Sequence, residues 1–418
     1  MKILFVSPFL PYPPVAGGHR QIWTWLTRLS RDHEVAFVGF YERESESGSI
    51  AEIARHCVTT RTRLRQPTPH AYCSFAQAPR WVSEFHSDEL ARDLREVAAG
   101  FHPDVAQFLH TNMAQYRPCV NGAAAVVTAL DIAFVSHRRR IAATTGLDRL
   151  HARFEWLRML RHEAALFRRA DHVIAVSDHD ARIVRAVAKH NRITAVPPGV
   201  EREQLAPRER RPNPGGLLYV GHMEHFPNVD GLLYLYNDIW PAVRREIPAA
   251  RLTIAGGGTR EELARVAPET LARMERDSSV EIAGFVPDLT ALMDGGAAMA
   301  APLRLGSGVR NKVIEAMAAG LPVVTTSLGA EGLAVEHGRE VLIADTAQAF
   351  ARELVGLLKE ARLQSQLSAA GRELVARDHD NDRIVKRLER ALIRAAGRAS
   401  PAGMGAQRCA PTGSGERA

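Results

Sequence analysis

The chain has 418 residues, of which 46% are hydrophobic and 24% are charged, and these fractions are typical of globular proteins rather than of fibrous or disordered ones. This length exceeds that of one typical domain and suits two domains of about 150–200 residues each. A formal net charge of +7 favours anionic partners, four cysteines exclude a dense disulfide framework and favour a cytoplasmic setting, and no apolar run is long enough to span a membrane.

Short apolar runs alternate with longer amphipathic segments through the first half of the chain. Such runs, separated by helices, are typical of parallel sheets that are covered on both faces. The first run, "KILFVS", lacks the layout of a signal peptide and is interpreted as a buried strand. The sequence therefore predicts a doubly wound α/β domain over residues 1–196. Its predicted strands are residues 2–7, 34–40, 104–109, 124–130, 172–177 and 193–197.

A second series of apolar runs begins after residues 197–216, which are rich in Pro, Gly and charge and are predicted to be a linker. The series predicts a second α/β domain, with a doubly wound parallel sheet, over residues 217–375. Ligands of such sheets bind beyond the carboxyl ends of the strands, so we expect the site in the cleft between two facing domains. The predicted strands are residues 216–221, 251–256, 280–285, 297–302, 322–326 and 340–344.

The last part of the chain is predicted to be helical over residues 346–396. Within it, residues 376–396 are expected to form a C-terminal helix that is a candidate to return to the first domain. Residues 397–418 contain almost no large apolar side chains, and this composition predicts a disordered tail.

The segment "APLRLGSGVRNKVIEAMAAGLPVVTT", residues 301–326, concentrates groups that bind phosphate. Gly306 and Gly308 allow backbone N–H groups to approach a ligand closely. A helix predicted from Val309 to Ala319 adds free N–H donors at its positive end. Its expected outward face carries Asn311, Lys312 and Glu315, and its inward face carries Val313, Ile314 and Met317.

Three charged residues give this segment its predicted chemistry. Arg310, expected in the first helical turn, and Lys312 can neutralise a diphosphate, while Glu315 can accept hydrogen bonds from ribose hydroxyl groups. The segment is therefore predicted to bind a nucleoside diphosphate. The alternative is that Lys312 and Glu315, spaced i and i+3, form a simple surface ion pair.

Three other patterns each allow two interpretations. "SDHD" (177–180) could hold a metal or cap a helix, and the spacing of Ser177 and Asp180 favours the cap. "HMEH" (222–225) has no further predicted ligands, so we predict no metal site. Residues 137–170 contain nine Arg among recurring apolar residues and could lie on an anionic membrane or form a packed helix with a solvated basic side. No nucleic-acid-binding module is predicted.

The 301–326 segment, with "GAEGL" (329–333), resembles the signature of glycosyltransferase family 4. Similar resemblance extends to other stretches, namely residues 3–21, 219–235, 251–258 and 280–289. The resemblance implies the GT-B fold, in which two Rossmann-like domains face each other. It also implies a retaining transferase that uses a UDP- or GDP-sugar and requires no metal and no further cofactor.

The resemblance assigns roles to individual residues. It implies that Arg310 and Lys312 bind the diphosphate and stabilise its charge during catalysis, that Glu315 binds the ribose, and that the loop 284–288 contacts the base. The further candidates for donor contact are Gly17, Gly18, Gly221, His222, Gly284, Val286, Gly306, Ser307 and Gly308.

The chain departs from the family pattern at three places. Ser307 stands where the family often has a first glutamate, and His222 and Asp230 stand where many members have Arg and Lys. A histidine that many members carry at an N-domain strand end is also absent. Asp131 and His110, each at a strand end, are the two candidates for that catalytic role.

The resemblance implies that residues 1–196 bind the acceptor, which is a glycan, a lipid-linked glycan or another hydroxyl compound, and that residues 217–375 bind the nucleotide sugar. It also implies a cytoplasmic protein that could lie at the inner face of the membrane. Two alternatives remain open. One is a nucleotide-sugar 2-epimerase, which has a similar fold, and the other is a catalytically silent nucleotide-binding protein.

Overall fold

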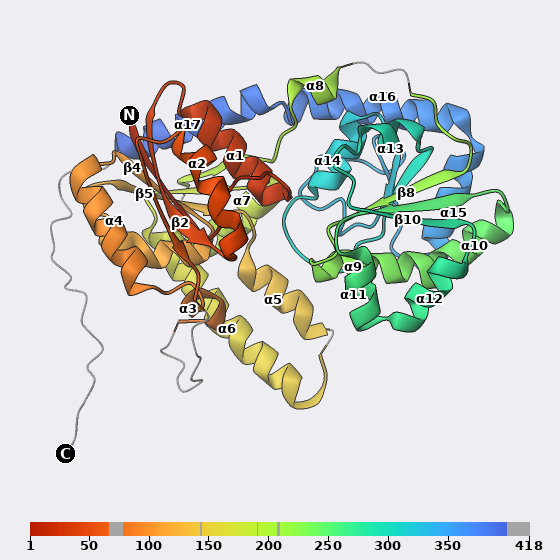
Figure 1. The fold of residues 1–418 in the computed structure, drawn as a ribbon, viewed down its shortest axis with the longest axis horizontal. Helices are drawn as coiled ribbons and strands as arrows, with labels where there is room; N and C mark the ends of the chain where they lie inside the picture. Colours follow the sequence, from red (N-terminus) through yellow and green to blue (C-terminus); the bar gives the residue numbers. More distant parts are fainter. Residues whose placement is uncertain (67–77, 143, 190, 207–209, 399–418) are drawn as a thin grey trace.

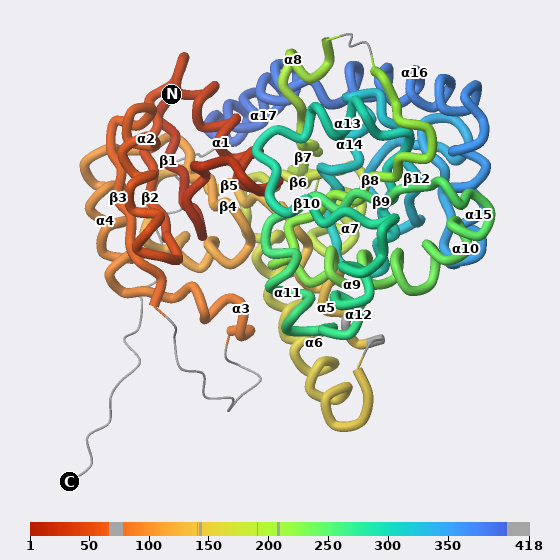
Figure 2. Tube along the Cα trace, turned by 45° about the vertical axis from the view of Figure 1, so that its right-hand side comes forward, coloured from red at the N-terminus to blue at the C-terminus, as the bar shows by residue number. Residues whose placement is uncertain are grey.

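The protein was analysed as a computed structural model that describes residues 1–66, 78–142, 144–189, 191–206 and 210–398. Two α/β lobes, each built on one parallel sheet, lie side by side in Figure 1 and in the turned view of Figure 2. The two doubly wound domains expected from the sequence are thus confirmed. Most of the expected disordered tail, and residues 207–209 of the expected linker, lie outside the described residues.

The first sheet has seven strands in the order β3-β2-β1-β4-β5-β6-β7, and all its pairs are parallel. The chain order reverses between β1 and β4, which creates a topological switch point at the carboxyl ends of those strands. The strands are β1 (Lys2–Ser7), β2 (Glu34–Tyr41), β3 (Thr59–Leu64), β4 (Val105–Leu109), β5 (Ala124–Ala129), β6 (His172–Ala175) and β7 (Ile193–Ala195).

Both faces of the first sheet are buried, because alternate side chains of each strand point to opposite faces. Leu4 and Val6 of β1 belong to one core cluster, and Ile3 and Phe5 belong to the other. The helices of this lobe are α1 (Gly17–Leu29), α2 (Ile50–Ala54), α3 (Arg80–Ser83), α4 (Asp88–Phe101), α5 (Ala133–Ala142), α6 (Gly146–Arg169) and α7 (Asp178–Ala188).

The second sheet has six parallel strands in the order β10-β9-β8-β11-β12-β13, with its switch point between β8 and β11. Its strands are β8 (Gly216–Val220), β9 (Arg251–Ala255), β10 (Val280–Gly284), β11 (Ala298–Ala301), β12 (Val323–Thr325) and β13 (Leu342–Ile343). Its helices are α9 (Phe226–Tyr234), α10 (Trp240–Glu246), α11 (Thr259–Val266), α12 (Pro268–Arg276), α13 (Thr290–Gly295), α14 (Asn311–Ala318), α15 (Ala347–Lys359) and α16 (Ala361–Asp378).

The chain crosses between the lobes twice, and the two crossings lie side by side. The first crossing leads from β7 to α8 (Arg202–Leu205), and the second leads from α16 to α17 (Asn381–Ala396). The backbone N–H of Val200 donates to the carbonyl of His379 (2.8 Å), and that of Asn381 donates to the carbonyl of Val200 (3.2 Å). Helix α17 then packs on α1 and on the strands β4, β5 and β6 of the first sheet.

Candidate functional site

The loop after β11 carries the predicted phosphate-binding glycines and meets the first lobe. Gly306 and Gly308 have φ angles of +101° and +76°, a region in which glycine is favoured. A Cβ atom on Gly308 would lie 3.2 Å from the carbonyl oxygen of Leu130, at the end of β5. The absence of a side chain therefore lets this loop approach the carboxyl edge of the first sheet.

Helix α14 begins two residues later than the sequence predicts. Its first residue is Asn311, and Arg310 is the N-cap with extended backbone angles rather than a residue of the first turn. The expected inward face is correct, since Val313, Ile314 and Met317 are all buried. Pro322 lies beyond the helix, after a glycine in the left-handed conformation.

Lys312 lies at the carboxyl end of β8, beside the switch point of the second sheet. Its ammonium group donates to the carbonyl of Val220 and to Oδ1 of Asn228, both at 2.8 Å, and it lies 5.1 Å from the centroid of the Tyr219 ring. Burial, reinforced by the nearby Arg310, lowers the pKa of Lys312 to about 7. Lys312 and Glu315 therefore do not form the surface pair that the spacing also allowed.

Arg310 is a largely enclosed cation with unsatisfied donors. One Nη1–H donates to the carbonyl of Ser307 (2.6 Å), but Nε and Nη2 have no hydrogen-bond partner in the described part of the chain. Burial lowers the pKa of this guanidinium below its usual range, an effect that the nearby Asp131 opposes. An anion that accepts from both free nitrogens would satisfy this side chain.

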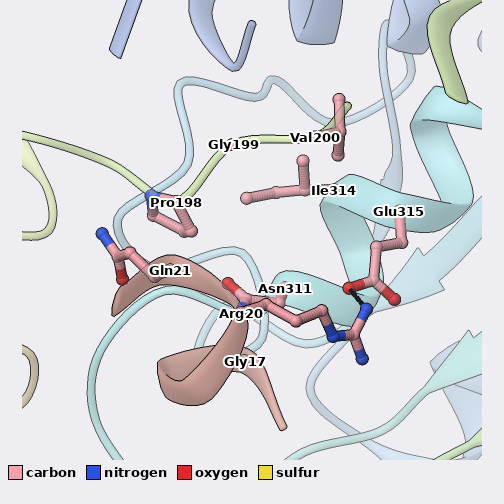
Figure 3. Close-up of a pocket in the computed structure, with 9 residues that line it drawn as sticks. All are labelled: Gly17, Arg20, Gln21, Pro198, Gly199, Val200, Asn311, Ile314 and Glu315. Atoms are coloured by element: carbon pink, nitrogen blue, oxygen red, sulfur yellow. Dashed lines mark hydrogen bonds and ion pairs between the residues drawn. The ribbon is translucent and has the colours of Figure 1, made fainter. Parts of the chain in front are cut away.

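Glu315 faces the first lobe across the crevice, where it forms an ion pair with Arg20 of α1 (Figure 3). Burial raises the pKa of this carboxyl group, and Arg20 opposes the shift. The pair borders a pocket of about 20 Å³ between the lobes. The pocket is lined by Gly17, Arg20, Gln21, Pro198, Gly199, Val200, Asn311, Ile314 and Glu315.

Asp131 and Ser307 meet across the same crevice. The Ser307 hydroxyl donates to Oδ1 of Asp131, and the Ser136 hydroxyl lies 3.1 Å from that oxygen and 2.5 Å from the Ser307 hydroxyl. Arg139 of α5 also reaches the second lobe, donating to the carbonyl of Gly306 (2.6 Å). The strand-end carboxylate and the serine of the glycine loop are therefore in direct contact.

His110 follows β4 and is the second candidate strand-end residue. It has a φ of +84°, uncommon outside glycine, and its ring contacts those of Phe9 and Trp81 at 6.3 and 5.7 Å between centroids. Burial lowers its pKa, an effect opposed by Asp131, so the neutral imidazole is favoured. Its Nδ1 atom has no partner within the described residues.

Glu163 of α6, which the sequence analysis did not single out, supports both strand-end loops. Its buried carboxylate accepts from the hydroxyl of Thr111 (2.7 Å) and from the backbone N–H groups of Ala133 (3.2 Å) and Phe134 (2.9 Å). Thr111 follows His110, and Ala133 lies two residues after Asp131. The carboxylate thus connects the loops that carry the two candidates.

Of the other candidates, the structure brings the two glycines after β1 to the crevice and places the base-contact loop at the carboxyl edge of the second sheet, where the backbone N–H of Gly256 donates to the carbonyl of Gly284 (2.7 Å). A Cβ on Gly17 would lie 1.9 Å from Nδ2 of Asn311. Gly221 lies against the turn after β9, since a Cβ on Gly256 would meet the Gly221 carbonyl oxygen. A Cβ on Gly18 would approach Phe9 and Leu130, Gly284 has a φ of +68°, and Val286 packs on the core around α13 and α14.

His222 and Asp230, which stand where many family members have Arg and Lys, make contacts of their own. His222 is half exposed and lies 3.4 Å from a carboxylate oxygen of Glu224. Asp230 accepts a two-pronged ion pair from Arg304, at 2.7 and 3.1 Å. His225, the last residue of the HMEH stretch, lies close enough to Arg310 and Lys312 that they help burial to lower its pKa.

Three findings bear on ligands and membranes. Within the described ranges, no three His, Cys, Asp or Glu side chains are grouped so that they could hold a metal ion. Ser177 caps α7, its hydroxyl accepting from the backbone N–H of Asp180 (3.0 Å), as the sequence favours. No described helix combines the length and the hydropathy that crossing a bilayer requires.

Comparison with known families relates the second lobe to sugar transfer. Residues 214–360 match the family model described as glycosyl transferases group 1. An uncharacterised protein of the cps region of Klebsiella pneumoniae is 27% identical over 173 residues, which are 40% of this chain and 43% of the relative. The D-inositol 3-phosphate glycosyltransferase of Nocardiopsis dassonvillei is 28% identical over 241 residues, 52% of this chain and 54% of the relative. The chain thus spans about half the length of these relatives.

Solved structures resemble the whole chain. Sucrose-phosphate synthase from Thermosynechococcus elongatus has a TM-score of 0.71 at 19% identity, with 96% of this chain and 100% of that one covered. HepE from Anabaena, in complex with UDP-glucose, has a TM-score of 0.68 at 14% identity, with coverage of 94% and 100%. The GT-B fold implied by the sequence is therefore confirmed.

Proposed function

We propose that this GT-B chain, with a second lobe that matches the glycosyl transferases group 1 model, is a glycosyltransferase that moves a sugar from a nucleoside-diphosphate sugar to a hydroxyl acceptor. The observation that carries the proposal is the enclosed pair Arg310 and Lys312 at the switch point of the second sheet, one turn from Glu315. Two cations and a carboxylate match a diphosphate and a ribose.

The proposed donor is a UDP- or GDP-sugar, bound by the second lobe. The free Nε and Nη2 atoms of Arg310 would donate to the diphosphate, while Lys312 would exchange its protein acceptors for phosphate oxygens. Glu315 would accept from the ribose hydroxyl groups once Arg20 releases it. The UDP-glucose complex of HepE, which has the same fold, supports a nucleotide-sugar donor.

In the proposed reaction the acceptor oxygen bonds to the anomeric carbon on the face from which the phosphate departs, and the bond from that carbon to the phosphate oxygen breaks. The acceptor proton passes to the departing phosphate, so the products are the retained glycoside and a nucleoside diphosphate. Arg310 and Lys312 would stabilise the negative charge that develops on the phosphate. These two cations would carry out this task without a metal ion or another cofactor.

The acceptor side of the proposed reaction belongs to the first lobe. Asp131 and His110 lie at adjacent strand ends there, and either can orient the acceptor hydroxyl by accepting its hydrogen bond. We propose a glycan or a lipid-linked glycan as the acceptor, within polysaccharide biosynthesis. The similarity to the D-inositol 3-phosphate glycosyltransferase supports an acceptor with hydroxyl groups.

A peripheral position at an anionic membrane on the cytoplasmic side is part of the proposal. Helices α5 and α6 project from the first lobe (Figures 1 and 2), and residue 143 between them is outside the described part. One stripe of α6 exposes four large apolar side chains, and Arg149, Arg153 and Arg161 are exposed beside it. The apolar residues are Leu147, Leu150, Phe154 and Leu157.

The membrane contact is tested by sedimentation with vesicles of neutral lipid, with and without anionic lipid. The wild type should bind the anionic vesicles, and L150E/F154E should not. The control V58E/V266E changes two exposed valines elsewhere and should bind like the wild type. Equal binding of both double variants would remove the membrane from the proposal.

The proposed activity is tested by thermal shift over a panel of nucleotides and nucleotide sugars, followed by transfer assays with the stabilising donor. We expect one UDP- or GDP-sugar to raise Tm and to be consumed only when an acceptor is present. Conversion of UDP-GlcNAc without an acceptor would establish the epimerase alternative instead. Binding without transfer to any acceptor would support a catalytically silent protein.

A further inference from the structure

The C-terminal helix α17 carries a stripe of arginines that the proposed reaction does not use. Arg387, Arg390 and Arg394 are spaced i, i+3 and i+7, so they share one exposed face of the helix. The opposite face, with Ile384, Leu388 and Leu392, is buried on the first sheet. The three guanidinium groups therefore stand together on the surface of the first lobe.

The acidic residues of α17 do not neutralise this stripe. Asp382 forms an ion pair with Arg28, and Glu389 contacts His33 at 2.9 Å, both on the side of α1. Among the residues that the structure describes, no carboxylate forms an ion pair with any of the three arginines. Arg387 donates to the carbonyl of Ala195 (3.2 Å), and it helps to lower the pKa of Asp378, whose ion pair is with Arg377.

These arginines form one wall of a groove of about 380 Å³. The other wall is the edge strand β7, residues Ile193–Ala195, together with Asp178 at the first position of α7. A volume of this size lies within the range of small-ligand sites, of about 300–1,000 Å³. Asp178 lies at the positive end of α7, which offsets its negative charge. The groove as a whole therefore carries an excess of positive charge.

The groove runs along the edge strand β7, and its Asp178 end lies at the carboxyl edge of the first sheet, near the second lobe. Asp178 follows Ser177, and a Cβ on Gly332 of the second lobe would lie 3.1 Å from the Ser177 hydroxyl. His179, the next residue, lies 3.9 Å from a carboxylate oxygen of Glu331. A ligand that extends from the crevice along the first lobe can therefore reach the three arginines.

We propose that this groove, lined by Arg387, Arg390 and Arg394, binds a phosphate group carried by the acceptor of the reaction proposed above. Guanidinium groups at this spacing can donate several charge-assisted hydrogen bonds to phosphate oxygens. A phosphate held here would place the rest of the acceptor toward the crevice. The inference rests on the proposed function for the identity of the ligand, and on the groove for its chemistry.

The site is tested by calorimetric titration with inorganic pyrophosphate at about 150 mM salt, which screens diffuse charge. Every protein in this titration carries Lys312→Ala, which weakens pyrophosphate binding at the proposed donor site. We expect R387A/R390A/R394A to raise Kd for pyrophosphate at least about tenfold, a loss that corresponds to about 1.4 kcal/mol. The control R245A/R352A/R362A removes three exposed arginines of the second lobe and should leave Kd unchanged.

The proposed site would be contradicted if R387A/R390A/R394A and R245A/R352A/R362A had equal Kd values for pyrophosphate. It would also be contradicted if the protein with an intact groove did not bind pyrophosphate. A substitution of the same three arginines by lysine should restore part of the affinity and shows that the fold is kept. R387A/R390A/R394A could instead lower sedimentation with anionic vesicles and leave Kd for pyrophosphate unchanged. That result would make the stripe a membrane contact and would contradict the proposed phosphate site. Groove-dependent binding of pyrophosphate supports the site even when no nucleotide binds, so the two proposals can fail separately.

Discussion

At the scale of single residues, the sequence identifies the charged groups of the crevice better than the contacts that hold them. Lys312 and Glu315 lie one helical turn apart, and their spacing is enough to predict that they share a side of the helix, while Arg310 directly precedes it as the N-cap. Their partners are remote, since Arg20 is 295 residues from Glu315 and Asn228 is 84 residues from Lys312. No local pattern links such pairs, because the fold alone brings them together.

Lys312→Ala should reduce kcat/KM by about 10²–10³-fold, because the departing phosphate would lose one of its two cations. The rate is measured with the donor found in the nucleotide panel. Lys359→Ala, which removes an exposed lysine paired with Glu246, is the control and should keep the wild-type rate. A near-wild-type rate for Lys312→Ala would remove this residue from the mechanism.

The pKa of Lys312, at about 7, should make the proposed nucleotide binding dependent on pH. The ammonium form, which attracts phosphate, is present below that pKa and is lost as the pH rises through it. Calorimetric titration between pH 6 and pH 8.5 should therefore show weaker binding of the nucleoside diphosphate at the higher pH, by up to about tenfold per pH unit. Lys312→Ala should bind weakly with little slope, and an equal slope in that variant would assign the dependence to another group.

The buried carboxyl group of Glu163 should make the free energy of unfolding depend on pH. Burial raises the pKa of this carboxyl group from 4.5 to about 7, so between these values the folded protein holds a proton that the unfolded chain releases. Stability should therefore fall as the pH rises through this window, by up to about 3 kcal/mol. Urea unfolding at pH 5 and pH 7.5 measures the change, and Glu163→Gln should show a smaller difference between the two.

At the scale of elements, apolar runs predict buried strands well, but a polar edge strand lacks this signal and is missed. All twelve predicted runs overlap strands of the structure, but β3, with the sequence TTRTRL, was not predicted. It is one of the two edge strands of its sheet, and none of its residues is fully buried, so it lacks the apolar signal. In contrast, the amphipathic pattern of residues 376–396 predicted a helix there, and α17 begins at Asn381.

Helix α17 should be essential to the stability of the first lobe, because it completes one face of the first sheet. Leu388 is fully buried in that core, so Leu388→Ala should lower the free energy of unfolding by about 2–5 kcal/mol. Ile393 on the same helix is 51% exposed, so Ile393→Ala should cost much less. Urea unfolding followed by tryptophan fluorescence measures both, and equal losses would show that α17 does not pack as described.

At the scale of the whole molecule, the sequence predicts two facing lobes but not the distance between them. The lobes meet through side chains that satisfy one another, such as Asp131 with Ser307 and Arg139 with Glu331 at 2.5 Å. The pocket of about 20 Å³ beside Arg20 and Glu315 is far smaller than the 300 Å³ or more that ligand sites usually offer. Nucleotide entry should therefore require the lobes to separate, with the paired crossings near Val200 and Asp380 as the natural hinge.

Arg20→Ala should favour the open arrangement, because the Arg20–Glu315 pair would have to break before Glu315 could bind a ribose as proposed. The arginine is 43% exposed, so solvent screens the pair and the gain in nucleotide affinity should be modest, about two- to fivefold. Small-angle X-ray scattering of the nucleotide-free variant should give a larger radius of gyration than that of the wild type. Arg43→Ala breaks an exposed ion pair with Glu224, also between the lobes, and should change neither quantity. Weaker nucleotide binding by Arg20→Ala would instead make Arg20 a donor-binding residue, and an unchanged radius would show that this pair does not hold the lobes together.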